Sequence, residues 1–141
     1  NIQGPADGAA ALLLADEGTV NSQQLKPLAR ILGWACVGSD PVETGLGAVP
    51  AVRKLVDATG VGVNQVDLFE INDVFASQAI ITSRMLNIDP TKVNVDGGAI
   101  TIGHPVAATG ARMVVHLVHE MRRRNLKRGI AASSCGGGQG V

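Results

Sequence analysis

The sequence predicts an α/β fold in which helices cover a layered sheet that contains some parallel strands. Short apolar runs typical of buried strands alternate with longer segments whose apolar residues recur at helical spacing. Such an alternation favours strands connected by helices over an all-α or all-β fold. Hydrophobic residues make up 45% of the 141 residues, which predicts a packed core rather than a disordered chain.

The N-terminal part of the chain is predicted to hold two strands and a helix. Residues 9–15 (AAALLLA) form an apolar run that predicts a strand buried on both faces. Residues 27–38 (PLARILGWACVG) predict a second strand, which begins at a proline after a polar link. Residues 48–60 predict a helix, because apolar side chains recur at helical spacing and Gly60 is a suitable C-cap.

The remaining elements are predicted by the same two patterns. Strands are expected at residues 66–71 (VDLFEI), near 93–95 (VNV) and in the final apolar run 129–134 (GIAASS). Helices are expected at residues 75–86 and at about 108–124. The buried side chains of the first of these helices are predicted to include Phe75, Ile80 and Leu86.

Composition and charge exclude several classes of function. Lys and Arg total 12, as do Asp and Glu, so the chain lacks the basic field that nucleic-acid binding uses. No apolar run is long enough to predict a membrane-spanning helix. The two cysteines, Cys36 and Cys135, lack the spacing of a disulfide framework or a metal site. They indicate reduced thiols in an intracellular compartment, and we expect no nucleic acid, membrane or metal partner.

Three short stretches follow predicted strand ends, where open α/β sheets place their functional sites. They are EINDVFA (70–76), GGAITIGHP (97–105) and SSCGGGQG (133–140). His104 lies on a restricted loop between glycine and proline, so it is either a proton-transfer group or a loop histidine bonded to backbone. His116 and His119 lie on a helix and are interpreted as facing solvent.

Asn72 and the two cysteines each have two interpretations. Asn72 is either an N-cap of the following helix or an amide that orients a water or an oxyanion. Cys135 is either a small buried hydrophobe or a thiol beside N–H groups that three glycines leave uncovered. Such N–H groups could hold an oxyanion and lower the pKa of the thiol. Cys36, within an apolar run, is interpreted as structural.

The stretches EINDVFASQ, VDGGAITIGHP and CGGGQG, in this order and spacing, closely resemble the C-terminal half of thiolases. NIQGPADGAAALLLADE and LARILGWACVGSDP extend the resemblance over essentially the whole chain. It implies a layered α-β-α fold with a mixed five-stranded sheet whose last strand is truncated. Residues 1–21 would be the closing strand of a first thiolase domain plus a linker, and residues 22–141 the C-terminal domain.

The resemblance also implies acyl transfer between coenzyme A and a nucleophilic cysteine, in Claisen condensation or in cleavage of 3-oxoacyl-CoA. His104 would activate the nucleophile and form an oxyanion hole with a water held by Asn72. Cys135 would be the acid/base, and backbone N–H groups around Gly136 would form a second oxyanion hole. The residues expected to contact substrate are Gln3 and Phe75, although Gln3 replaces the serine usual in the family.

One departure from the family pattern concerns the acid/base. Thiolases usually have one residue between this cysteine and the glycines, whereas Cys135 directly precedes Gly136. An ungapped alignment therefore places Ser134 at the cysteine position, and one residue along a strand turns a side chain to the opposite face. We assign the role to Cys135 and keep Ser134 as the alternative.

The resemblance implies partners outside these residues. No stretch resembles the half of a thiolase that carries the nucleophilic cysteine, so we expect a missing N-terminal half and no turnover by this chain alone. A homodimer or homotetramer is expected, with acyl-CoA as substrate and no resident cofactor. The alternative is a degenerate thiolase-like protein that binds acyl-CoA or acts as a scaffold. Acyl-chain length, reaction direction and the choice among cytoplasm, mitochondrion and peroxisome are left open.

Overall fold

The computed structural model describes all residues from Asn1 to Val141. Its α-helices are α1 (Glu17–Ser22), α2 (Ala48–Thr59), α3 (Ala76–Leu86), α4 (Ala99–Ile102) and α5 (Thr109–Arg123). Its strands are β1 (Val37–Gly38), β2 (Leu68–Ile71), β3 (Gly129–Ala132), β4 (Ser134–Cys135) and β5 (Gln139–Gly140). Three short 3-10 helices lie at Pro41–Glu43, Val63–Gln65 and Pro90–Lys92.

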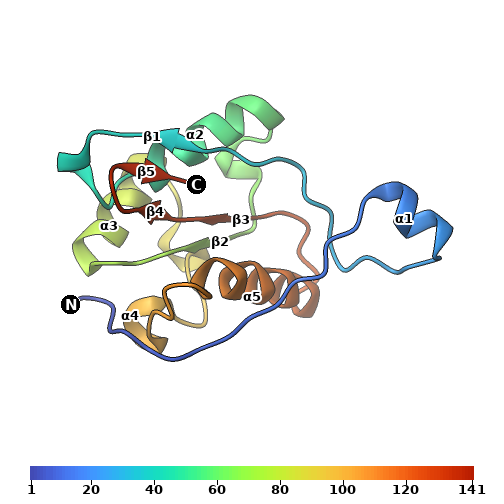
Figure 1. Cartoon of the computed structure of the whole chain (residues 1–141). Coiled ribbons are helices and arrows are strands. Elements are labelled where there is room, and N and C mark those ends of the chain that lie inside the picture. The colour runs from blue at the N-terminus through green and yellow to red at the C-terminus, as the bar shows by residue number, and fades with distance from the viewer.

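The five strands form two sheets, so the prediction of one mixed five-stranded sheet is wrong. β2 and β3 are parallel, with Leu68 opposite Gly129 and Ile71 opposite Ala132. β1, β5 and β4 form an antiparallel sheet in that order. Ser133 alone separates β3 from β4, and it exchanges two backbone hydrogen bonds with Val141. One continuous segment therefore passes from the parallel sheet into the antiparallel one, which makes the arrangement mixed (Figure 1).

Helices cover both faces of the parallel pair, which confirms the layered α/β prediction. Alternate residues of β2 point to opposite faces, so Phe69 and Ile71 belong to the core beneath α2 and α3. Glu70 points the other way and contacts α5, which packs against β2 and β3 (Figure 1). Because both faces are covered, all four residues of β2 are buried.

The helices with clear periodicity form where they are predicted. α2 ends at Gly60, whose left-handed φ of 68° and N–H bond to Val56 provide the predicted C-cap. α5 and β2 also lie within their predicted ranges. Leu86 of α3 is buried as expected, but Phe75 and Ile80 are exposed by 44% and 53%, which contradicts their predicted burial.

Three predicted strands are wrong or much shorter than expected. Residues 9–15 have no strand partner, and the side chain of Leu13 is 92% exposed. Only Val37–Gly38 of the predicted strand 27–38 pairs with another strand, and residues 93–95 contribute a single bridge to Phe69. An apolar run becomes a strand only where a neighbour accepts its backbone hydrogen bonds. The segment before α2 instead runs around the sheets and carries α1 outward (Figure 1).

None of the helices combines the length and the apolar composition that crossing a lipid bilayer requires.

Candidate active site

Asn72 follows the last residue of β2 and is only 3% exposed. Its N–H donates to the carbonyl of Ala132 at 3.0 Å, and its carbonyl accepts from Nε2 of Gln78 at 3.3 Å. The N-cap of α3 is Phe75, so the N-cap interpretation of Asn72 is wrong. The side-chain Oδ1 of Asn72 is buried without a protein partner. A buried acceptor of this kind is usually satisfied by an ordered water or a ligand.

Asn94 holds the strand that carries Asn72, a role that its position in the sequence did not indicate. Its Oδ1 accepts from the N–H of Ile71 at 2.9 Å, and its Nδ2 donates to the carbonyl of Ile71 at 2.8 Å. Its own N–H donates to the carbonyl of Phe69 at 2.9 Å. Asn94 has a φ of 47°, a left-handed conformation that asparagine tolerates well. It thus fixes both polar groups of the residue before Asn72.

His104 lies on the loop between α4 and α5, partly buried. Its N–H donates to the carbonyl of Gly4 at 2.8 Å, and its Nδ1 lies 2.8 Å from Oγ1 of Thr109. Gly103 before it has a φ of 93°, and a Cβ there would lie 2.5 Å from the side chain of Ala6. Only glycine fits this conformation and this close approach. Thr109 was not identified from the sequence, because a threonine at a helix start carries no functional signal of its own.

The first five residues join the Asn72 segment to the His104 segment. The N–H of Gln3 donates to the carbonyl of Val74 at 3.0 Å, and Ile2 forms a bridge with Phe75. Gly4 accepts from the N–H of His104, and Pro5 forms a bridge with His104. The structure therefore brings Gln3 and Phe75 into the same region as Asn72 and His104. The side-chain Oε1 of Gln3 is also buried without a protein partner.

The glycines after Cys135 form the turn between β4 and β5. Gly137 and Gly138 have φ values of 79° and 75°, which favour glycine. A Cβ on Gly138 would lie 2.3 Å from the backbone oxygen of Ser39. Gly136 has no positive φ, and a Cβ there would meet open space. The turn and one close approach thus explain two of the three glycines.

Cys135 lies three residues after the end of β3, and its side chain is exposed. The interpretation of Cys135 as a buried hydrophobe is therefore wrong. It pairs with Gln139, whereas Ser134 pairs with Gly140 and is partly buried. Adjacent strand residues point to opposite faces, so only one of Ser134 and Cys135 faces any given site. Cys36 is also exposed, which contradicts its expected structural role.

A charged network lies on the α5 side of β2. Glu70, 2% exposed, pairs with Nη1 of Arg112 at 3.3 Å and with Nδ1 of His116 at 2.8 Å. Burial raises the pKa of the Glu70 carboxyl, while His116 and Arg112 oppose that rise. His116 also bonds to Asp96 through Nε2 at 3.1 Å, so its predicted orientation toward solvent is wrong. His119 is exposed, as expected.

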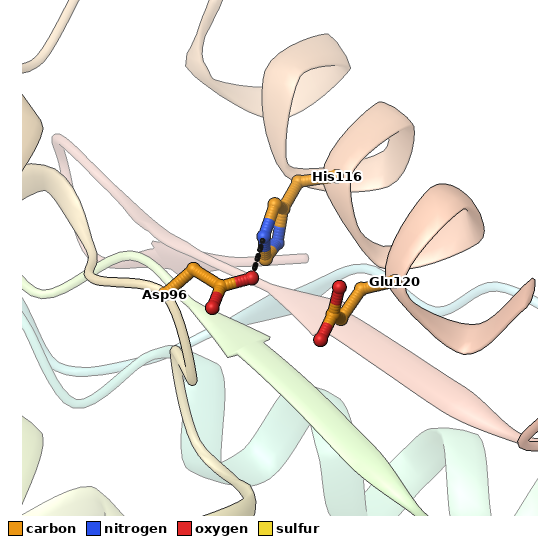
Figure 2. Close-up of side chains that lie close together, drawn as sticks. All are labelled: Asp96, His116 and Glu120. Atoms are coloured by element: carbon orange, nitrogen blue, oxygen red, sulfur yellow. Dashed lines mark hydrogen bonds and ion pairs between the residues drawn. The ribbon is translucent and has the colours of Figure 1, made fainter. Parts of the chain in front are cut away.

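Asp96, His116 and Glu120 place donor atoms within 4.8 Å of one another, the only such group of metal-ligating residue types (Figure 2). Their donor atoms already have partners. Glu120 pairs with Arg123 and Arg124, and the hydrogen bond from Arg123 is the largest cause that lowers the pKa of Glu120 to about 2. A cation here would have to compete with these guanidinium groups, so we interpret the cluster as an ion-pair network.

A cavity of about 680 Å³ lies between α3 and residues 87–94 and is lined by none of the predicted site residues. A smaller cavity of about 150 Å³ lies between α5 and β3 and includes Ser133. The residues of the predicted site thus line neither of these two cavities.

The family model described as "Thiolase, C-terminal domain" matches residues 25–141, and the chain belongs to this family. It is 45% identical to bovine (Bos taurus) mitochondrial 3-ketoacyl-CoA thiolase and 46% identical to an acetyl-CoA acetyltransferase of Shinella zoogloeoides. Both matches cover 100% of this chain but 36% of the relative. The chain therefore spans about a third of the length of these relatives.

The fold agrees with a solved thiolase as well. The structure of human mitochondrial 3-ketoacyl-CoA thiolase in complex with CoA matches with a TM-score of 0.86 and 43% identity. This match covers 88% of this chain and 32% of that one. The predicted family and the thiolase-like fold are confirmed.

Proposed function

We propose that this chain provides the histidine, asparagine and cysteine half of a thiolase active site. The whole protein would transfer acyl groups to and from coenzyme A, by Claisen condensation or by thiolytic cleavage of 3-oxoacyl-CoA. The observation that carries this proposal is that residues 1–5 join the Asn72 segment to the His104 segment. The relatives named as thiolase and acetyl-CoA acetyltransferase support the reaction class, and the CoA complex of one thiolase supports the substrate.

His104 and Asn72 would act on the first acyl group. The imidazole takes the proton of a nucleophilic cysteine thiol outside these 141 residues, and the sulfur keeps the electron pair and attacks the carbonyl carbon. Negative charge then develops on the carbonyl oxygen, and the tetrahedral intermediate collapses as a leaving group takes the bonding electron pair: the coenzyme A thiolate in condensation, or the acyl-CoA carbanion in cleavage. The imidazolium and a water held by the free Oδ1 of Asn72 stabilise that charge.

Cys135 would act on the second substrate. In condensation its thiolate removes a proton from the α-carbon of an acyl-CoA, and the carbanion attacks the acyl group on the nucleophile. The nucleophilic sulfur leaves with its bonding electrons. N–H groups around Gly136 would stabilise the thioester oxygen of the carbanion. In cleavage the same thiol returns the proton to carbon.

Further proposals concern the surroundings of the site. Gln3 and Phe75 would contact the acyl-CoA, and Phe75 is exposed enough to do so. Residues 1–21 would belong to a first domain and residues 22–141 to a second. The exposed leucines at 12–14 would then pack on the missing N-terminal half. The assembly would be a homodimer or homotetramer. The relatives include one named as mitochondrial and one named as cytosolic, so the compartment is left open.

The test is cleavage of acetoacetyl-CoA by the complete protein and by the 141-residue chain alone. We expect turnover only from the complete protein. His104→Ala and Cys135→Ala should each lower kcat by about 100-fold or more, the usual effect of removing an acid/base group. Ser134→Ala is the matched control and should retain most activity. Loss of activity in Ser134→Ala, with Cys135→Ala active, would assign the acid/base position to Ser134 instead.

The second candidate function is binding of acyl-CoA without turnover. It is favoured by Ser134 at the position where the family has its cysteine, because a serine hydroxyl is a much weaker acid than a thiol. A complete protein that binds acetyl-CoA in calorimetry but shows no cleavage or condensation would establish this function and exclude the first.

A further inference from the structure

We propose that Thr109 is a positioning residue that holds the imidazole of His104 in the tautomer with its proton on Nδ1. The ring nitrogen Nε2 is then left unprotonated. The catalytic use of this tautomer rests on the function proposed above for His104, whereas the tautomer itself does not.

Two short contacts of one hydroxyl carry the inference. Oγ1 of Thr109 lies 2.8 Å from Nδ1 of His104 and 3.1 Å from the carbonyl oxygen of Pro105. A hydroxyl has a single proton, so it donates in one of these contacts only. Thr109 is 3% exposed, which leaves little room for water to take part.

Only one assignment makes both contacts favourable. If the hydroxyl donates to Pro105, it accepts from an Nδ1–H of His104, and both contacts are hydrogen bonds. If it donates to His104, two oxygen acceptors face each other at 3.1 Å with no proton between them. Threonine in a helix commonly bonds to the carbonyl four residues earlier, which is the spacing of Thr109 and Pro105. We therefore base the inference on the first assignment.

Backbone hydrogen bonds fix the loop on both sides of His104. The N–H of His104 is bonded to Gly4, and the carbonyl of Pro105 accepts from the N–H groups of Ala108 and Thr109 at 2.8 and 2.9 Å. The loop that carries the histidine is thus tied to the first turn of α5. The hydroxyl of Thr109 adds a side-chain bond to a loop whose backbone is already fixed.

The tautomer determines what His104 does first. With Nδ1 protonated, Nε2 accepts the thiol proton directly, and the sulfur keeps the electron pair. The resulting imidazolium still donates from Nδ1 to Thr109, so no proton or ring has to move between activation and charge stabilisation. The other tautomer has no lone pair on Nε2 and requires a prior proton shift.

Three variants test the role of the Thr109 hydroxyl. Thr109→Val removes the hydroxyl with little change of volume, and Pro105 keeps its two N–H donors. Thr109→Ser retains the hydroxyl. Thr59→Val is the matched control, because Thr59 makes the same kind of bond to the carbonyl of Leu55 at 2.8 Å and lies on α2.

The experiment is NMR of the complete protein labelled with ¹⁵N-histidine, with the His104 signals identified by their loss in His104→Gln. Wild type should show a protonated Nδ1 and an unprotonated Nε2 in the neutral ring, and Thr109→Val should show mixed tautomers. In acetoacetyl-CoA cleavage, Thr109→Val should lower kcat by about 10- to 100-fold, as expected for loss of a hydrogen bond to a charged group, with KM changed less than about twofold. Thr109→Ser should recover most of the activity, and Thr59→Val should match wild type in both measurements.

A wild-type ring with its proton on Nε2, or an unchanged tautomer in Thr109→Val, would overturn the inference. So would an unchanged kcat in an active Thr109→Val enzyme. A wild-type protein without turnover that still shows the Nδ1–H tautomer, lost in Thr109→Val, would uphold the tautomer and refute the proposed function.

Discussion

Replacing Asn94 should loosen the end of β2 and with it the position of Asn72. The side chain of Asn94 satisfies the N–H and the carbonyl of Ile71, a buried residue. Asn94→Ala leaves both groups without these partners. Asn94→Gly removes the same bonds but accepts the left-handed backbone, so it separates the side-chain effect from backbone strain.

The size of the effect follows from the two lost bonds. A buried polar group left unsatisfied costs about 1 to 3 kcal/mol, so two groups correspond to about 2 to 6 kcal/mol. Asn94 itself is partly exposed, and water will replace some of the loss, which favours the lower half of this range. For Asn94→Ala we add about 1 kcal/mol for a left-handed non-glycine residue.

Amide hydrogen exchange in a peptide that covers residues 68–74 measures this local stability in the complete protein. A loss of about 2 kcal/mol corresponds to roughly 30-fold faster exchange of the Ile71 amide. Asn87→Ala is the matched control, because Asn87 has a similar φ of 52° but an exposed side chain. Unchanged protection in Asn94→Gly, or an equal effect of Asn87→Ala on the same peptide, would refute the reasoning.

Three further predictions follow from single contacts. Asp67, whose carboxylate accepts two backbone N–H groups at 2.9 Å that lower its pKa, should contribute about 1 to 2 kcal/mol at neutral pH. This stabilisation is present above the ordinary pKa of 3.8 and is lost as pH falls through the lowered one, so urea midpoints of wild type and Asp67→Ala should converge in acid. Burial raises the pKa of Glu70, so the stabilisation that its protonated form gives the fold is lost as pH rises from the ordinary value of 4.5 through the raised pKa. Glu70→Gln should therefore flatten the decline of the unfolding free energy above about pH 4.5. An unchanged slope of unfolding free energy against pH would contradict this. Gly138→Ala should lower the melting temperature, since its Cβ would meet the backbone of Ser39 at 2.3 Å, whereas Gly136→Ala should be tolerated; equal melting temperatures would contradict the prediction.

Local patterns predicted the elements that carry their own signals. The helices over 48–60 and 108–124 have continuous helical periodicity, and the strand over 66–71 is buried on both faces. The strand predicted at 9–15 failed, because an apolar run does not specify its partner strand. The side chain of Phe75 is exposed for a related reason: it precedes the helix as its N-cap rather than lying on the buried face.

The candidate site stays a prediction that rests on motif order. Motif order pointed to His104, Asn72 and Cys135, and the structure places the first two segments beside each other through residues 1–5. Nothing in the sequence indicated Thr109 or Asn94. Each is notable only for side-chain hydrogen bonds, Thr109 to His104 and Asn94 to Ile71, and these bonds exist only in the folded structure.

The sequence by itself determined the family, the alternation of strands and helices, and the residue types available for the proposed acyl transfer, since these reside in local order and composition. The tertiary structure alone decided which face each side chain occupies and which donor meets which acceptor. Hydrogen bonds between distant residues depend on ångström-scale positions, and only packing of the helices on the sheet sets those positions.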